Sequence, residues 1–157
     1  MIFSESIARN IAVGDGEVDT ERLESAAKIA CIHDFVMSLP LRYDTKIGKD
    51  GVGLSQGQRQ RILIARAVYK DPAFIFLDEA TNSLDAKNER EIVENLDKFY
   101  KGRTVVVVAH RLSTVMNADR IIVLDGGKVV ETGDHASLIA AKGAYYNLVK
   151  NQLELGN

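Results

Sequence analysis

Three short, unbroken apolar runs constrain the fold of this chain more than any other feature of its sequence. They occupy residues 73–77, 105–109 and 121–124, and segments of helical length separate them. A half-exposed strand alternates apolar and polar residues, whereas continuous apolar runs are typical of buried strands in a parallel sheet. Apolar residues also recur at helical spacing between the first two runs, which predicts an α/β fold with a β-α-β crossover. These residues are Ile92, Val93, Leu96, Phe99 and Tyr100.

The first half of the chain predicts short helices. A helix that buries Ile7 and Ile11 is expected first, and Asp19 is a natural N-cap for a second helix. A further short apolar stretch is closed by Pro40. Residues 41–53 are rich in glycine and charge, which is typical of a loop.

The last part of the chain predicts a hairpin followed by two helices. The third apolar run leads through Asp125, Gly126 and Gly127 into a second apolar pair, which is the pattern of a tight β-hairpin. Helices are then expected over residues 134–141 and 144–153.

The composition excludes several classes of protein. With 20 basic and 22 acidic residues, the net charge is −2, which gives no electrostatic reason to expect nucleic acid as a partner. Cys31 is the single cysteine of the chain, so no internal disulfide can form. No apolar run approaches the ~20 residues of a membrane helix, and the first residues do not have the pattern of an export signal. We therefore expect the chain itself to be soluble, with no transmembrane segment or signal peptide.

A capping box marks the start of a longer helix. Ser55 and Gln58 have the Ser-x-x-Gln spacing, and few helix breakers follow before Pro72. At such a helix start, the N–H groups of Gln56, Gly57 and Gln58 are expected to be free, and the helix dipole adds positive potential. Ser55 is at least a capping residue, and the segment also predicts a site for an anion.

Polar residues follow two of the predicted strands at the point where each ends. Asp78 and Glu79 come directly after the first apolar run, and His110 comes directly after the second. Because the carboxyl ends of parallel strands form the ligand edge of an open sheet, these side chains are expected to converge. Asp78 is a candidate ligand for Mg²⁺, which prefers oxygen ligands and retains part of its water shell. The alternatives are a simple loop start for the acidic pair, a structural role for His110 and a helix N-cap role for Asp85.

Taken together, these motifs resemble those of ATP-binding cassette (ABC) ATPases. Residues 54–58 read Leu-Ser-Gln-Gly-Gln, which looks like the family's signature motif, and Asp78-Glu79 looks like its Walker B segment. Ser83-Leu84-Asp85 resembles the D-loop, and His110 resembles the switch histidine. The resemblance covers essentially the whole chain and is greatest to exporters of peptides, lipids or drugs. It implies part of a RecA-like P-loop NTPase core with a parallel sheet over residues 71–157, preceded by an α-helical subdomain over residues 1–70.

The resemblance also implies a site for ATP and Mg²⁺. Glu79 would accept a proton from the attacking water, His110 would contact the γ-phosphate, and Asp78 would hold Mg²⁺. The signature motif would meet ATP bound on an opposite subunit, so the implied partners are a second nucleotide-binding domain and the transmembrane domain of an exporter. The implied location of the parent protein is the cytoplasmic face of the cell membrane. The residues implied in nucleotide binding are Leu54, Ser55, Gln56, Gly57, Gln58 and Asp85.

One motif of the family is missing from these residues. A P-loop needs a glycine, four residues and then Gly-Lys-Ser/Thr, whereas Gly48-Lys49 and Gly127-Lys128 have Tyr43 and Ile122 where the first glycine belongs. We therefore expect the C-terminal portion of an exporter's nucleotide-binding domain, whose parent couples MgATP hydrolysis to efflux and which is inactive by itself. Two alternatives stay open. The chain could be a non-catalytic module that supplies the signature motif in trans to a partner with a P-loop, or a fragment of a non-transport ABC ATPase.

The signature motif departs from the family at one position. Gln56 stands in place of the first glycine of the usual Leu-Ser-Gly-Gly-Gln. The longer side chain is expected to crowd the approach of a phosphate slightly, while Gly57 stays available.

Overall fold

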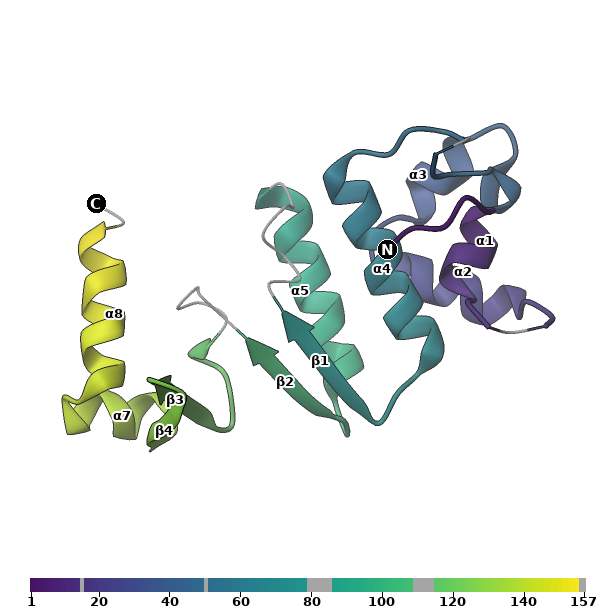
Figure 1. Cartoon of the computed structure of the whole chain (residues 1–157). Helices are drawn as coiled ribbons and strands as arrows, with labels where there is room; N and C mark the ends of the chain where they lie inside the picture. Colours follow the sequence, from purple (N-terminus) through teal and green to yellow (C-terminus); the bar gives the residue numbers. More distant parts are fainter. Residues whose placement is uncertain (15, 50, 79–85, 109–114, 156–157) are drawn as a thin grey trace. The chain divides into compact units, whose positions relative to one another are not determined.

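The chain forms two compact units, Met1–Val107 and Val108–Asn157. The computed structural model describes residues 1–157 apart from 15, 50, 79–85, 109–114 and 156–157 (Figure 1). The side chains of residues 78, 86–90 and 152–155 also lie outside the description. The predicted α/β class is confirmed, since each unit combines helices with a two-stranded sheet. The predicted boundary at residue 70 stays a prediction.

Short helices open the first unit, as the sequence predicts. Ser6 and Asp19 cap the first two, and each side chain accepts a hydrogen bond from the backbone N–H three residues later, at 3.2 and 3.0 Å respectively. Such caps satisfy N–H groups that have no acceptor within the helix. The predicted loop over residues 41–53 contains a single turn of 3₁₀ helix. These elements are α1 (Ile7–Ile11), α2 (Thr20–Ile29), α3 (His33–Ser38) and η1 (Arg42–Asp44).

The next helix, α4 (Gln56–Lys70), packs against α1 and α2. It ends at Asp71, which adopts the left-handed conformation with φ 48° and ψ 52°, and Pro72 follows. A fully buried apolar core between the helices holds α4 in place. Its largest members are Tyr69, Ile7, Ile11, Ile32, Ile47, Ile62, Ile92 and Val36.

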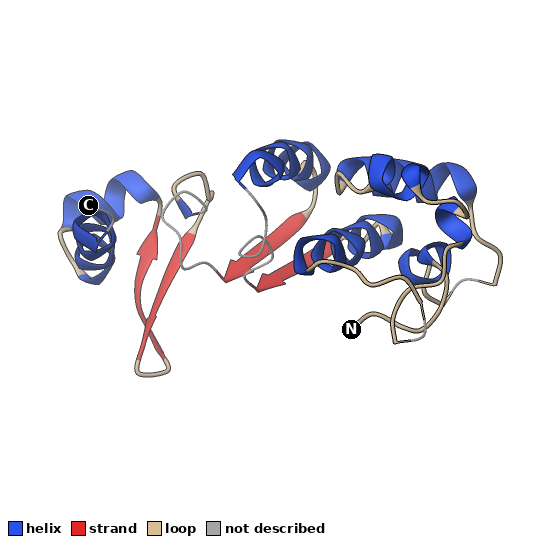
Figure 2. Ribbon diagram, turned by 90° about the horizontal axis from the view of Figure 1, so that it is seen from above, coloured by secondary structure: helices blue, strands red, loops and turns tan. Residues whose placement is uncertain are grey.

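The predicted β-α-β crossover follows α4. It consists of β1 (Phe74–Asp78), α5 (Ala86–Tyr100) and β2 (Thr104–Val108). The two strands pair in one sheet and point in the same direction in Figure 1. Figure 2 shows α5 on one side of this sheet.

The apolar face of α5 is narrower than its sequence predicts. Ile92 and Leu96 are buried in the core of the first unit, and Phe99 and Tyr100 are half-buried against it. Val93 is 41% exposed, so its assignment to this face is wrong. At about 100° per residue, Val93 lies at the edge of the stripe that Ile92, Leu96, Phe99 and Tyr100 form.

The strands of this unit are not buried on both faces, contrary to the prediction from their unbroken apolar runs. Ile75 points to the covered side of β1 and is only 5% exposed, whereas Phe74 and Phe76 on the opposite side are 66% and 77% exposed. On β2, Val106 is 44% exposed. The second face of this sheet is therefore open in the described part of the chain.

The second unit begins its described structure with the predicted hairpin. β3 (Ile121–Asp125) pairs antiparallel with β4 (Lys128–Gly133). Gly126 and Gly127 make the turn with φ values of 52° and 75°, as a two-residue turn of type I′ requires. The third apolar run therefore forms one strand of a hairpin, and its expected place in a parallel sheet stays a prediction.

Two helices cover one face of this hairpin. They are the predicted α7 (His135–Ala141) and α8 (Ala144–Leu155). Ile121 and Val123 are buried against them, in a cluster with Leu138, Tyr145 and Val149. On the other face, Ile122 and Leu124 are 57% and 67% exposed. Among the helices that the structure describes, none combines the length and apolarity needed to cross a membrane.

Candidate functional site

The start of α4 has the geometry that its capping box predicts. Ser55 has an extended backbone, with φ −64° and ψ 162°, and its Oγ accepts a hydrogen bond from the Gln58 N–H at 3.2 Å. In return, Gln58 Oε1 accepts a hydrogen bond from the Ser55 N–H at 2.9 Å. These reciprocal bonds fix the direction in which the helix begins.

Three backbone N–H groups are predicted to be free at this helix start, and two of them have no acceptor within the helix. The Gln58 N–H is bound to Ser55, so its prediction as a free donor is wrong. The N–H groups of Gln56 and Gly57 have no acceptor within the helix, because the first turn lacks preceding carbonyl groups. Ser55 and Gln56 are exposed, and Gly57 is half-exposed. With the positive end of the helix dipole, this arrangement can bind an anion.

Leu54 joins this helix start to the core of the first unit. Its side chain is only 9% exposed and belongs to the core of the first unit. Its backbone carbonyl accepts a hydrogen bond from Arg59 Nε at 3.2 Å. Leu54 therefore anchors the segment, while the exposed polar groups of the next residues face outward.

The loop before Leu54 is closely folded. Val52 donates its backbone N–H to the Lys46 carbonyl at 2.9 Å. A Cβ atom at Gly51 would lie 2.3 Å from the same carbonyl oxygen, which is far inside van der Waals contact. Only glycine fits at position 51 without a shift of the loop. Gly51 therefore helps to fix the course of the backbone that leads to Ser55.

Asn10 is a structurally important residue that the sequence patterns miss. It is fully buried on α1, and its Nδ2 donates to the carbonyl oxygens of Phe3, Glu5 and Ser6 at 3.0–3.3 Å. Its Oδ1 accepts from the Phe3 N–H at 2.8 Å. One amide thus satisfies the backbone of the segment before α1. The available signal was a polar residue next to Ile11 on a face that otherwise predicts a core.

The remaining candidates lie at or beyond the edge of the described structure. Asp78 is the last residue of β1, as predicted, and its side chain lies outside the described residues. Glu79, Asp85 and His110 lie outside the described residues altogether. β2 ends at Val108, two positions before His110 in the sequence. The convergence of these side chains therefore stays a prediction.

Asp78 at the end of β1 is a candidate for one kind of metal site. Among the residues that the structure describes, no group of three or more histidine, cysteine or acidic side chains lies together. A site built wholly from protein ligands is therefore not present in that part of the chain. Mg²⁺ usually needs only one or two carboxylates, with water and phosphate oxygens as its other ligands, and Asp78 fits this pattern.

The single thiol is not a candidate nucleophile. Burial raises the pKa of Cys31, and the nearby Glu91 carboxylate raises it further, although a hydrogen bond from Asn95 acts in the opposite direction. Asn95 Nδ2 lies 3.5 Å from the Cys31 sulfur. A thiol with a raised pKa stays protonated and unreactive at neutral pH.

A comparison with protein-family profiles identifies the first half of the chain. A family profile described as ABC transporter matches residues 2–82. This stretch contains α4 with its capping box, β1 and the acidic pair at residues 78 and 79.

Relatives align over nearly the whole chain. An ATP-dependent lipid A-core flippase from Saccharophagus degradans is 50% identical over 97% of this chain, and ABC transporter B family member 2 from Dictyostelium discoideum is 47% identical over 97%. The chain spans 26% and 11% of the lengths of these two relatives, respectively. A solved bacterial Atm1-family ABC exporter with ATP bound matches 96% of this chain, with a TM-score of 0.88 and 39% identity, and the match covers 26% of that exporter chain.

Proposed function

This chain belongs to the ABC transporter family of ATP-binding domains, and on that premise we propose that it is the C-terminal portion of an exporter's nucleotide-binding domain. In the parent protein, this domain couples MgATP hydrolysis to efflux across the membrane. The relatives support an exporter rather than a non-transport ATPase, because they include a lipid A-core flippase and an Atm1-family exporter.

The observation that carries the proposal is the exposed start of α4. Ser55 Oγ accepts the Gln58 N–H, which leaves its own hydroxyl hydrogen available for a phosphate oxygen. The outward N–H groups of Gln56 and Gly57 add two further donors at the positive helix end. We propose that this surface binds the γ-phosphate of ATP held by the P-loop of a second nucleotide-binding domain. Leu54 and Gln58 hold the surface in place.

The residues after β1 and β2 have different proposed roles. Asp78 would hold Mg²⁺, Glu79 would accept a proton from water, and His110 would orient that water and the phosphate. Asp85 would contact nucleotide across the domain interface. The places of Asp78, Glu79 and His110 in the sequence, at or just after strand ends, support these roles, as does the match of all four residues to the family motifs.

The proposed partners follow from this division of roles. The surface at Ser55 serves nucleotide on another domain, so it needs a second nucleotide-binding domain. A transmembrane domain is the expected partner in the parent, which would place the domain at the cytoplasmic face of the membrane. The isolated chain is expected to be inactive, because its sequence contains no P-loop motif. In a P-loop, a lysine and several backbone N–H groups bind the phosphates of ATP.

A binding experiment tests the surface at Ser55. The chain is titrated against an immobilised, complete ABC nucleotide-binding domain, with and without MgATP. We expect MgATP to tighten binding by about tenfold or more, and Ser55→Arg to abolish this gain. Ser38→Arg is the matched control, because Ser38 is also exposed but lies on α3. Equal binding with and without MgATP would refute the proposal.

A turnover experiment separates the two forms of the proposal. We expect the chain alone to release phosphate from ATP no faster than its Glu79→Gln variant. Robust turnover that depends on Glu79 would contradict the predicted inactivity. ATP-dependent binding without any increase in the partner's turnover would favour the alternative, a non-catalytic module that supplies the signature motif in trans.

A further inference from the structure

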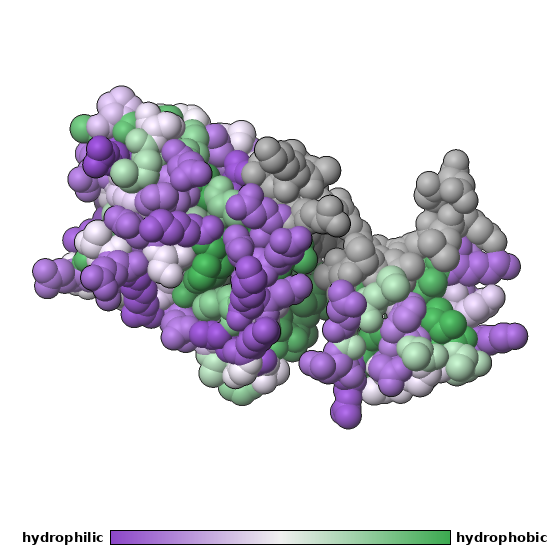
Figure 3. Space-filling view, turned by 180° about the vertical axis from the view of Figure 1, so that it is seen from behind, coloured by the Kyte–Doolittle hydropathy of each residue, from purple (hydrophilic) through white to green (hydrophobic). Residues whose placement is uncertain are grey.

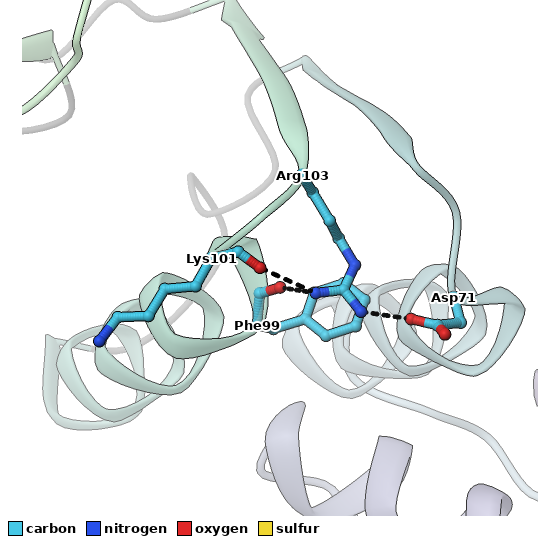
Figure 4. A network of polar contacts seen from close by, with 4 residues as sticks. All are labelled: Asp71, Phe99, Lys101 and Arg103. Atoms are coloured by element: carbon cyan, nitrogen blue, oxygen red, sulfur yellow. Dashed lines mark hydrogen bonds and ion pairs between the residues drawn. The ribbon is translucent and has the colours of Figure 1, made fainter.

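Arg103 connects three separate parts of the first unit. It lies between α5 and β2, and its Nη2 donates to Asp71 Oδ1 at 2.5 Å (Figure 4). Its Nη1 donates to the carbonyl oxygens of Phe99 and Lys101 at the end of α5. The guanidinium also stacks on the Phe99 ring, 4.1 Å from the ring centroid. One side chain thus holds the ends of two helices together.

The contact to Asp71 fixes the end of α4. Asp71 is the left-handed C-cap residue of that helix, and only residues 71–73 separate α4 from β1. At the same level, the Thr104 N–H donates to the Ala73 carbonyl at 3.0 Å and joins the starts of the two strands. Arg103 therefore ties α4 to the base of the sheet.

Packing between the helices is incomplete at this junction. A hollow of about 290 Å³ is lined by residues of α2, α4 and α5, with Asp71 and Phe99 in its wall. Apolar surface of the first unit lies open between hydrophilic side chains in Figure 3. Further along α5, Ile92 and Leu96 pack into the helical core, and Asn95 Nδ2 donates to the Ile29 carbonyl at 3.4 Å. These contacts hold the middle of α5, and Arg103 holds its C-terminal end.

The length of α4 makes its anchored end important. The helix has 15 residues, and Ser55 caps the end opposite Asp71. At a rise of 1.5 Å per residue, the helix is about 22 Å long, so a tilt of about 10° at Asp71 would move Ser55 by about 4 Å. Binding groups need to be held to within roughly 0.5 Å of their working geometry.

We propose that Arg103 is a positioning residue that sets the angle of α4 to the sheet and thereby the place of Ser55. The proposal extends the function proposed above, since Ser55 is the group that it positions. If Arg103 only stabilised the fold, its replacement would unfold the chain rather than change the angle of α4. Asp71 is 57% exposed, so solvent screens the ion pair and its contribution to global stability is small.

A distance measurement tests this role on the chain itself. Spin labels are placed at Gln56→Cys on α4 and Lys98→Cys on α5, in a Cys31→Ala background, and the distance distribution is measured by pulsed electron resonance. We expect one narrow distribution for the parent chain. Arg103→Gln and Asp71→Ala should each broaden or shift it by several ångströms, while the far-ultraviolet circular dichroism stays unchanged.

Two further variants make the test specific. Asp71→Asn keeps an oxygen acceptor for Arg103, so it should retain most of the narrow distribution that Asp71→Ala loses. Lys28→Gln is the matched control, because Lys28 forms another exposed ion pair, with Glu24 at 3.7 Å, away from the junction. An unchanged distribution in both Arg103→Gln and Asp71→Ala would overturn the proposal. So would unfolding of Arg103→Gln, which would indicate a stabilising role instead.

The binding assay separates this proposal from the one on which it rests. Arg103→Gln should weaken MgATP-dependent binding to a complete nucleotide-binding domain by about tenfold, with no change in binding without nucleotide. If the parent chain shows no MgATP dependence, the proposed function fails, whereas the distance measurement still decides whether Arg103 sets the angle of α4.

Discussion

Arg66 on α4 and Asn10 on α1 are joined by two hydrogen bonds. Arg66 Nε donates to the Asn10 backbone carbonyl at 2.7 Å, and Nη2 donates to the Asn10 side-chain oxygen at 3.4 Å. Arg66 Nη1 also donates to the Met1 carbonyl at 3.0 Å. The segment before α1 is therefore tied to the same helix that presents Ser55, through a residue that is fully buried.

Loss of the Asn10 amide should destabilise the first unit. Asn10→Ala would leave the Phe3 N–H and several backbone carbonyls without their partner in a part-buried site. We expect a fall of about 2–3 kcal/mol in the free energy of unfolding, measured by urea denaturation. Asn147→Ala is the control, since Asn147 is exposed on α8 and its replacement should change stability by less than about 0.5 kcal/mol. Equal effects at the two positions would show that the network around Asn10 contributes little.

Two neighbouring glycines should respond differently to the same substitution. Gly51→Ala would place a methyl group 2.3 Å from the Lys46 carbonyl oxygen, whereas a Cβ at Gly53 meets no atom within 4 Å. We expect Gly51→Ala to lower the free energy of unfolding by about 1–3 kcal/mol because the loop must shift, and Gly53→Ala to have little effect. Urea denaturation of the two variants side by side measures the difference. A tolerated alanine at 51 would mean that the loop before Ser55 yields easily.

The features that sequence predicts well in this chain depend on local chemistry. Ser55, Asp19 and Asp134 cap helices because a short polar side chain reaches the N–H three residues ahead, which involves no distant contact. The hairpin turn at Gly126 and Gly127 follows from backbone freedom alone. The α/β class and the family itself could therefore be predicted from such patterns and the linked motifs.

Burial is the feature that the sequence predicts poorly here. The run around Phe76 predicts a strand covered on both faces, yet that residue is 77% exposed. An unbroken apolar run indicates that both faces of a strand need apolar partners. It does not indicate which part of the protein supplies those partners. The role of Asn10 could not be predicted for a different reason. Its side chain binds backbone carbonyls that come together only in the folded chain. Glu79 and His110 lie outside the described residues, so their roles stay predictions.

Alkaline pH should weaken the first unit through a half-buried tyrosine. Burial raises the pKa of Tyr100 to about 12 from an ordinary value of 10.0, and the Asp97 carboxylate adds to the shift. The phenol therefore ionises at lower pH in the unfolded chain than in the folded chain. Its contribution to stability is complete below pH 10 and is lost as the pH rises to about 12.

Tyr100→Phe tests this pH dependence. The variant keeps the ring but has no phenol to ionise, so its urea midpoint should fall less steeply above pH 10 than that of the parent chain. Burial also raises the pKa of Tyr43 to about 12, so Tyr43→Phe should reduce the slope further in the double variant. Identical slopes for the parent chain and the double variant would contradict the assignment.

The open face of the first sheet should make the chain associate with itself. Phe74 and Phe76 are 66% and 77% exposed on the same side of β1, and exposed apolar sheet surfaces favour intermolecular contact. Phe76→Lys places a charge in the middle of this face without removing a buried contact. We expect the weight-average mass from sedimentation equilibrium to rise with concentration for the parent chain and to stay near 17.3 kDa for the variant.

Met37→Lys is the control, because Met37 is 38% exposed on α3, away from the sheet, and this variant should associate like the parent chain. If Phe76→Lys and Met37→Lys reduce association equally, the effect comes from net charge rather than from the open sheet face.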